Sequence, residues 1–128
     1  MRIAIRGGVM ALGLMAQGLM AQAAYAESPY RLVVVVGQPD DLRVGEQHAA
    51  LERGAAVLHE RDVVIQDITP DAARRERPGL GVNSQASFEL LLVGKDGEVK
   101  LRRDTPVAVS EIAALIDTMP MRQNEMRR

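Results

Sequence analysis

The stretch FELLLVGKDGEVKLR, residues 88–102, decides the fold. Its first half, Phe88–Val93, is a short apolar run of the kind that forms a buried strand. Lys95-Asp96-Gly97 is a tight-turn sequence, and Val99–Arg102 alternates apolar and charged side chains as a half-exposed strand does. The stretch therefore predicts an antiparallel hairpin that has one buried strand and one half-exposed strand.

A second apolar run, Arg31–Val36, lies upstream and contains four consecutive valines. A β-branched run without alternation is typical of a strand that is buried on both faces of a parallel sheet. Gly37-Gln38-Pro39 ends this strand, and Asp62–Ile68 reads as another strand further along the chain. We expect these two strands to be parallel neighbours joined by a right-handed crossover.

The crossover segment predicts one helix over residues 42–59. Asp40 or Asp41 can cap its N-terminus, because a carboxylate before the first turn accepts hydrogen bonds from free backbone amides. Gly54 weakens the middle of the helix by about 1 kcal/mol relative to alanine. The apolar stripe is imperfect and consists of Leu42, Ala49, Leu51, Ala55 and Leu58.

Residues 69–87 form a long polar connection that is rich in Gly, Pro and Arg. A helical turn is expected at Pro70–Arg75 and irregular backbone at Pro78–Gly81. After the hairpin, a last helix is expected to start near Ser110, whose hydroxyl can cap it, and to end at Pro120. Its apolar face carries Ile112, Leu115, Ile116 and Met119. The order β-α-β-β-β-α predicts an α/β thioredoxin-like sandwich with a four-stranded mixed sheet.

The N-terminus predicts export. Arg2 and Arg6 precede an uncharged apolar run over residues 9–21. This run is shorter than the roughly 20 apolar residues that a helix needs to cross a bilayer core. Small residues follow with the A-x-A spacing of signal peptidase sites, at Ala24-Tyr25-Ala26 or at Ala21-Gln22-Ala23. We therefore expect a signal peptide over 1–26, a single domain over 27–128, and a periplasmic or secreted location. Cleavage after Ala23 and an uncleaved membrane anchor are the alternatives.

The composition excludes several functions. The chain has no cysteine, so thiol redox chemistry, disulfides and thiolate metal sites are impossible. Removing Arg2 and Arg6 leaves 16 − 2 = 14 basic against 17 acidic residues, a net charge of −3. Neither nucleic acid nor an anionic membrane is expected as a partner of the mature chain. The only aromatic residues beyond 26 are Tyr30 and Phe88, too few to form a stacking platform for bases.

Two stretches carry a resemblance to a known family. Leu91–Gly97 together with Ile116–Gln123 resembles a bacterial family of exported, uncharacterised domains that is shared with secreted animal matrix proteins of the equarin and sushi-repeat group. The likeness covers about Tyr30 to Met126. It implies a thioredoxin-like fold and no established reaction.

The same resemblance shows where this chain departs from true thioredoxins. Their redox pair sits where the first strand meets the first helix, and that position reads Gln38-Pro39-Asp40-Asp41 here. Their cis-proline precedes the hairpin, and that position reads Ala86-Ser87-Phe88. Disulfide exchange is therefore not carried over by the resemblance.

Four groups of side chains are considered as candidates for a site. Asp40 and Asp41 would be a general base or cation-binding pair, or they cap the helix. The basic cluster Arg74, Arg75 and Arg77 would bind an anionic ligand or an acidic partner, or it is a solvated loop. His48 and His59 would lie roughly 16 Å apart on one helix, too far to share a metal.

The tail is the fourth group. Met119, Met121 and Met126 fall within eight residues, and their thioethers would bind Cu(I), contact a partner or pack against the sheet edge. Arg122 lies among them and would repel a cation.

The sequence favours a non-catalytic binding or interaction module that has no cofactor and an unknown envelope or extracellular protein partner. An enzyme built on Asp40 and Asp41 and a copper carrier built on the tail are the alternatives. The candidate surface consists of Gln38, Asp40, Asp41, Arg74, Arg75, Arg77, Met119, Met121 and Arg122.

Overall fold

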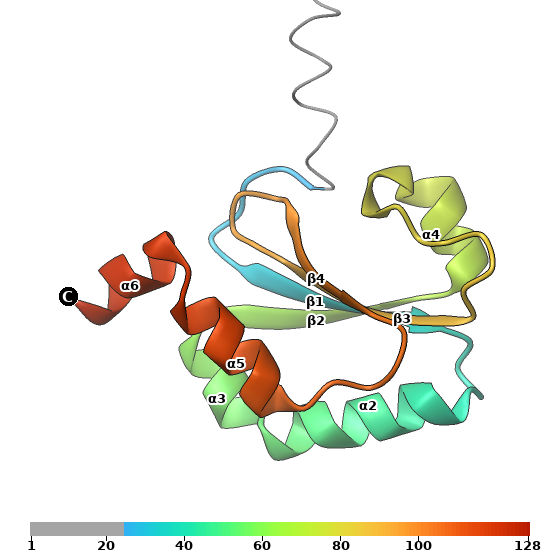
Figure 1. The fold of residues 1–128 in the computed structure, drawn as a ribbon, viewed down its shortest axis with the longest axis horizontal. Coiled ribbons are helices and arrows are strands. Elements are labelled where there is room, and N and C mark those ends of the chain that lie inside the picture. The colour runs from blue at the N-terminus through green and yellow to red at the C-terminus, as the bar shows by residue number, and fades with distance from the viewer. Residues whose placement is uncertain (1–24) are drawn as a thin grey trace, which may run out of the picture.

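The computed structural model describes residues 25–128, so all but Tyr25 and Ala26 of the expected signal peptide lies outside the described residues. Figure 1 shows a four-stranded sheet with helices on both faces. The strands are β1 (Arg31–Gly37), β2 (Val63–Ile68), β3 (Phe88–Val93) and β4 (Val99–Arg103), in the spatial order β2-β1-β3-β4. None of the helices in this part of the chain is long and apolar enough to cross a membrane.

The pairing of the strands confirms the predicted mixed sheet. β1 runs parallel to β2 and antiparallel to β3, and β3 forms the hairpin with β4. All six residues of β3 are buried, and five consecutive residues of β1, Val33–Gly37, are buried as well. The two central strands therefore require cover on both faces of the sheet, which their unbroken apolar runs predict.

One face is covered by three helices, α2 (Leu42–Arg53), α3 (Ala55–Glu60) and α5 (Val109–Asp117). These helices pack against the odd-numbered valines of β1 and the even-numbered leucines of β3. The buried amide of Gln47 fixes the segment before α5, because it donates to the carbonyl of Val107 at 2.9 Å and accepts from its N–H at 2.8 Å. The apolar members of this core are Val33, Val35, Val44, Leu51, Leu58, Phe88, Leu90, Leu92, Leu101, Val107, Ile112 and Ile116.

The other face is covered by the long connection, which is more ordered than its composition suggests. It forms α4 (Pro70–Glu76) and a 3₁₀ turn, η1 (Pro78–Leu80), and these bury Ala73 and Leu80 against the sheet. The hydroxyl of Thr69 caps α4 by accepting from the N–H of Ala72 at 3.3 Å. The helical turn expected at residues 70–75 is confirmed, while residues 78–80 are helical rather than irregular.

The first described residues, 25–28, cross the hairpin turn. The N–H of Tyr25 donates to the carbonyl of Gly97 at 3.0 Å, and the N–H of Ser28 donates to that of Lys95 at 2.9 Å. The Tyr25 hydroxyl reaches Gln66 of β2 at 2.9 Å. Gly97 has φ +84°, and a Cβ there would lie 1.8 Å from the carbonyl oxygen of Tyr25. Only glycine therefore fits where this strap, residues 25–28, passes the turn.

The single helix expected over 42–59 is wrong, because Gly54 divides it into α2 and α3. A Cβ at Gly54 would lie 2.6 Å from the side chain of Val109, so the bare backbone allows α5 to approach. The apolar stripe was also read partly wrong. Leu42 is 85% exposed, and Val44 and Gln47 are buried in its place with Leu51 and Leu58.

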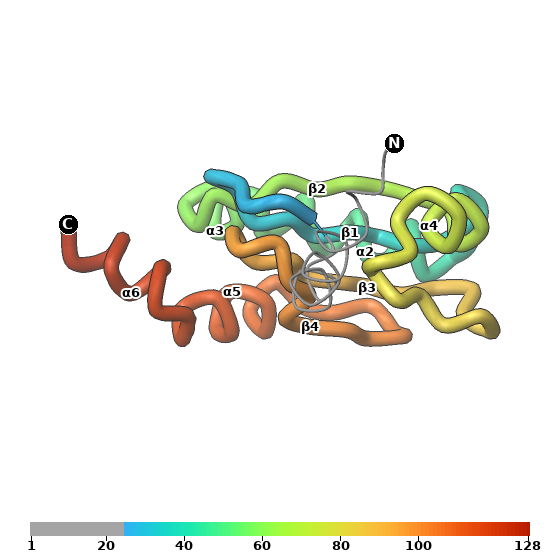
Figure 2. The backbone as a smooth tube through the Cα atoms, turned by 90° about the horizontal axis from the view of Figure 1, so that it is seen from above, coloured from blue at the N-terminus to red at the C-terminus, as the bar shows by residue number. Residues whose placement is uncertain are grey.

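Two expectations about the C-terminus also need correction. The last helix of the core, α5, begins at Val109 after Ala108, and Ser110 lies inside its first turn without capping it. Pro120 does not end the helical region, since α5 ends at Asp117 and Pro120 is the first residue of a further helix, α6 (Pro120–Met126). Proline suits the first position of a helix because its nitrogen needs no partner there. Figure 2 shows α6 extending away from the rest of the fold, beyond α5.

The substitution Leu92→Asp tests the assignment of the central strand. Leu92 is fully buried in β3, so an aspartate there would place an unpaired charge in the core, which destabilises the fold by several kcal/mol. We expect the variant to be unfolded at room temperature by circular dichroism. Leu42→Asp is the matched control and should stay within about 0.5 kcal/mol of the wild type, because Leu42 is exposed. A native melting temperature for Leu92→Asp would contradict the strand assignment.

Candidate functional site

The junction between β1 and α2 holds the aspartates that sequence analysis singled out. Asp41 is the N-cap of α2, and its carboxylate accepts from the backbone N–H of Arg43 at 2.9 Å. The Arg43 guanidinium grips the same carboxylate with bonds of 3.0 and 2.7 Å. The side-chain hydrogen bond from Arg43, aided by its backbone amide, lowers the pKa of Asp41 below its usual value. Asp41 is thus a helix cap that stays ionised.

A hollow of about 600 Å³ lies beside this junction, and its lining includes Gly37, Pro39, His48 and Asp67 but neither Asp40 nor Asp41. Asp40 is exposed. The two carboxylates therefore do not converge on a common cavity. The polar pair that does face this hollow is His48 Nε2 with Asp67 Oδ1 at 2.6 Å, which joins α2 to the end of β2. Nothing local in the sequence indicates this contact.

The three arginines of the long connection are each engaged within the chain. Arg74 donates to the carbonyl of Asn83 at 2.7 Å and to Asp71 at 3.2 Å. Arg75 is paired with its neighbour Glu76, and the guanidinium of Arg77 lies 5.4 Å from the centroid of the Tyr25 ring. These contacts fix α4 and the strap, and Arg75 and Arg77 are exposed whereas Arg74 is half-buried.

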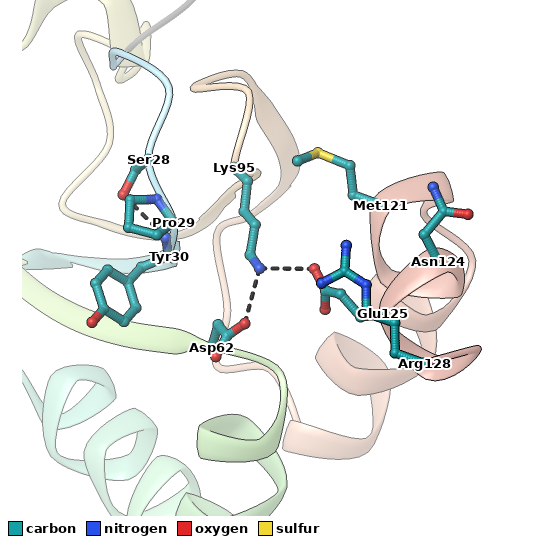
Figure 3. Close-up of a pocket in the computed structure, with 9 residues that line it drawn as sticks. All are labelled: Ser28, Pro29, Tyr30, Asp62, Lys95, Met121, Asn124, Glu125 and Arg128. Carbon is teal, nitrogen blue, oxygen red and sulfur yellow. Dashed lines mark hydrogen bonds and ion pairs between the residues drawn. The ribbon is translucent and has the colours of Figure 1, made fainter.

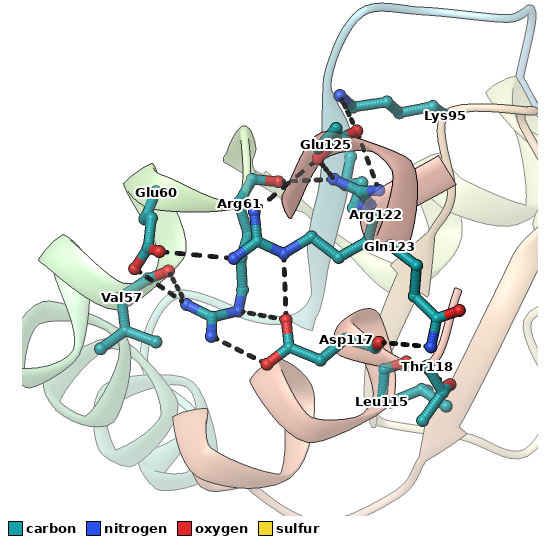
Figure 4. A network of polar contacts seen from close by, with 11 residues as sticks. Val57, Glu60, Arg61, Lys95, Leu115, Asp117, Thr118, Arg122, Gln123 and Glu125 are labelled. Carbon is teal, nitrogen blue, oxygen red and sulfur yellow. Dashed lines mark hydrogen bonds and ion pairs between the residues drawn. The ribbon is translucent and has the colours of Figure 1, made fainter. Parts of the chain in front are cut away.

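A different concentration of charge lies at the opposite end of the sheet, where α6 meets the start of β1 (Figure 4). We name this set the α6 ion cluster. It contains four basic and four acidic side chains, from β1, α3, the start of β2, the hairpin turn, α5 and α6. Its members are Arg31, Glu60, Arg61, Asp62, Lys95, Asp117, Arg122 and Glu125.

Glu125 is the centre of this cluster. Its carboxylate accepts from both Nη atoms of Arg31 at 3.3 Å and from Lys95 Nζ at 2.7 Å. Arg122 Nη1 lies 3.8 Å away. Burial opposes ionisation of Glu125, but the hydrogen bonds from Lys95 and Arg31 outweigh it and hold the pKa of this carboxyl below its usual 4.5. Glu125 therefore joins α6 to β1 and to the hairpin turn as a carboxylate.

Asp117 plays the same part for α5. Arg61 grips it with bonds of 3.0 and 2.9 Å, and Arg122 Nε adds a third at 3.0 Å. The hydrogen bond from Arg61 is the main reason that the pKa of Asp117 lies below its usual 3.8. Arg122, expected on the binding surface, is 5% exposed, and its guanidinium is used inside the cluster. The structure therefore places Arg122 as a positioning residue for α6.

Two hollows flank the cluster. Figure 3 shows the larger one, about 610 Å³, between the strap side of β1 and α6, with Tyr30, Lys95, Met121 and Glu125 in its wall. The smaller one, about 230 Å³, is walled by Met119, Pro120 and Met121 and by charged residues of the hairpin. We call the α6 ion cluster and these two hollows together the α6 end.

The candidate residues from the sequence therefore divide into two groups. Gln38, Asp40 and Asp41 follow the end of β1, whereas Met119, Met121 and Arg122 lie near its start. The six steps along β1 separate these ends by about 20 Å at roughly 3.3 Å each. Met119 and Met121 share the small hollow, while Met126 is half-exposed on the last turn of α6.

Sequence analysis missed Arg31, Lys95 and Glu125, although each lies in or beside a stretch that it discussed. Arg31 is the first residue of β1, directly before the valine run. Its place beside a run that predicts a buried strand is the one signal that its charge would need a partner. Glu125 lies 94 residues further along the chain, so no local pattern links the two. Within residues 25–128, no group of three or more histidine or acidic side chains is arranged to hold a metal ion.

Comparisons with known proteins agree with this fold. A family model described as a domain of unknown function, DUF4174, matches residues 24–125. The crystal structure of Trxlp from Edwardsiella tarda matches with a TM-score of 0.53 and 20% identity, over 79% of this chain and 91% of that one. Thioredoxin peroxidase I of Plasmodium yoelii matches with a TM-score of 0.56 and 14% identity, over 74% of this chain and 75% of that one. A search of curated proteins gives no match. The likeness to both structures shows the thioredoxin-like fold.

The pKa of Glu125 predicts how stability depends on pH. Because its pKa is lower in the folded chain than in the unfolded chain, the unfolded state binds more protons below about pH 4.5. The contribution of Glu125 is fully present above that pH and is lost as the pH falls through the folded pKa. We expect Glu125→Gln to cost about 3 kcal/mol at pH 7, because Arg31 and Lys95 lose their shared carboxylate.

Urea unfolding between pH 3 and pH 7 checks this prediction. Glu125→Gln should show a flatter loss of stability in the acid range than the wild type. Glu46→Gln on the exposed side of α2 is the matched control and should follow the wild-type curve. Parallel curves for the wild type and Glu125→Gln would mean that Glu125 carries no ionic contribution.

Proposed function

The chain belongs to the DUF4174 family, and we propose that it is an exported, non-catalytic thioredoxin-like module that binds an envelope or extracellular protein through its α6 end. The observation that carries this proposal is the residue that occupies the position of the thioredoxin thiols. Where thioredoxins hold their thiols, this chain holds Asp41, whose carboxylate is occupied by the N–H and guanidinium of Arg43. A scaffold with this junction and no cysteine can bind but cannot exchange thiols.

The alternative enzyme built on Asp40 and Asp41 has less support. A general base needs access to a substrate proton and a pKa near the working pH. Asp41 faces a guanidinium and its pKa is lowered, while Asp40 is exposed outside the neighbouring hollow. Capping therefore explains this pair without a catalytic role.

The α6 end is favoured as the binding surface because the two stretches that resemble the exported family meet there. Gly94, Lys95 and Asp96 come from the first stretch, and Met119–Met121 come from the second. Both line the small hollow, although they are separate in the chain. Met121 is also half-exposed, which suits the adaptable apolar contacts that methionine makes with partners.

Export is supported by the charged start, the apolar run and the A-x-A sites. The strap favours one of the two cleavage sites. Cleavage after Ala26 would remove Tyr25, which bonds to Gly97 and Gln66 and stacks with Arg77. Cleavage after Ala23 would keep Tyr25. We therefore propose that the mature chain begins at Ala24.

Intact-mass measurement of the protein recovered from the periplasm or medium tests both parts of this proposal. The expected mass is that of residues 24–128. A mass for residues 27–128 would contradict the role of Tyr25 and leave export intact. Full-length protein retained in the cytoplasm would contradict export itself. In addition, purified 24–128 should melt at a higher temperature than purified 27–128, because the shorter chain lacks the Tyr25 contacts.

Affinity capture with paired variants tests the binding surface. The tagged mature protein is used to capture partners from the envelope fraction of its own cell. Met121→Asp should lose the captured partner, and Leu42→Asp should retain it. Both substitutions replace an exposed apolar side chain in the first turn of a helix, so they are matched. Equal capture by both variants would contradict the α6 end as the surface, and reduction of a protein disulfide or peroxide by the pure chain would contradict the non-catalytic role.

A further inference from the structure

The smaller hollow at the α6 end has two chemically different walls. Met119, Pro120 and Met121 form an apolar wall, and side chains of β1 and of the hairpin form a charged one. Its volume of about 230 Å³ lies below the roughly 300–1,000 Å³ of sites for drug-sized ligands. A hollow of this size suits a ligand group of only a few heavy atoms.

The charged wall contains Arg31, whose guanidinium is only partly used. Its side chain is 1% exposed. Nη1 donates to the carbonyl of Arg61 and to Glu125, and Nη2 donates once, also to Glu125. Its Nε is the one buried side-chain nitrogen or oxygen atom between residues 25 and 128 that has no hydrogen-bond partner.

The planar geometry of the guanidinium shows which kind of ligand this free donor would suit. The Nε–H and the second Nη2–H point along the same edge of the planar group, as two parallel donors. That edge matches the two oxygens of a carboxylate, and such bidentate pairs are among the strongest charge-assisted hydrogen bonds in proteins. Glu125 occupies the end of the guanidinium, so the side edge remains for a second carboxylate.

The rest of the charged wall carries both signs, and its Lys95 is already paired with Asp62 and Glu125. Lys95 and Lys100 line the hollow with Arg31, against one carboxylate, Asp96. Asp96 and Glu98 hold Lys100 Nζ at 2.7 and 3.4 Å, so this ammonium is fixed at the rim. Gly94 leaves room for it, since a Cβ at Gly94 would lie 2.8 Å from Lys100 Cε.

We propose that this hollow binds a carboxylate attached to a short apolar group, with the free edge of Arg31 as its main contact and the wall of Met119, Pro120 and Met121 around its apolar part. The inference rests on the proposed function, because it names the ligand chemistry of the same α6 end. Two sources offer this chemistry, a free short-chain acid and the C-terminal carboxylate of a protein partner with a small apolar last residue.

Calorimetric titration of the mature protein with defined probes tests the proposal. Butyrate represents the free acid, and a pentapeptide ending in valine represents the protein C-terminus. Butyramide and the C-terminally amidated peptide are their uncharged controls. We expect saturable binding of at least one of the two carboxylates and about tenfold weaker binding of its amide, since the amide cannot form the charged bidentate pair. The probe that binds identifies the source.

Variants locate the binding. Arg31→Lys keeps the charge but removes the planar fork and should weaken binding about tenfold or more. Because Arg31 is buried and this variant could unfold, Lys100→Gln at the rim provides an independent test and should weaken binding several-fold. Arg103→Gln removes a charge from the same strand outside the hollow and should bind as the wild type does.

Equal binding of a carboxylate and its amide, no saturable binding of either carboxylate, or wild-type affinity in Lys100→Gln would overturn the inference. These results are distinct from a failure of the proposed function. If capture of an envelope protein depends on Met121 while neither carboxylate binds, the α6 end is still the binding surface and only the ligand chemistry is wrong.

Discussion

The burial of β1 and β3 on both faces is the constraint on which the rest of the structure depends. Neither strand has a polar side that could face water, so the sheet needs two covering layers. One layer is a conventional set of helices, α2, α3 and α5. The second is made from α4, the turn η1 and the strap, which is why a polar connection with only a few apolar side chains is nevertheless ordered. Ala73 and Leu80 are the fully buried apolar residues of this layer, and Tyr25 and Val82 pack against the same cluster.

The same constraint explains the α6 ion cluster. β1 begins with Arg31, and burial of the strand takes this guanidinium out of water, where an unpaired charge is costly. Glu125 offsets that cost, and Lys95 shares its carboxylate. α6 has few buried side chains of its own, since Arg122 is the one that the structure buries. This short helix is therefore held in place mainly by charge, and its position follows from Arg31.

The sequence predicted the parts of the fold that local pattern controls. The valine run of β1, the hairpin with its turn at Lys95–Gly97 and the N-cap at Asp41 are all confirmed. The errors arose where tertiary contacts override local preference. Gly54 breaks a helix because Val109 packs on it, and Leu42 is exposed because the helix turns Val44 and Gln47 inward. The pairing of Arg31 with Glu125 spans most of the chain, so no spacing rule reveals it.

The two ends of β1 therefore differ in whether their polar groups have hydrogen-bond partners. At the end that thioredoxins use for chemistry, the carboxylate of Asp41 is satisfied by the backbone N–H and the guanidinium of Arg43. At the other end, a buried guanidinium keeps an unused donor beside an apolar wall. Hydrogen-bonded polar groups stabilise the fold, whereas a buried N–H without a partner beside a hollow would gain a hydrogen bond from a ligand that reaches it. The proposed recognition surface therefore lies at the opposite end of the sheet from the position that holds the thiols in thioredoxins.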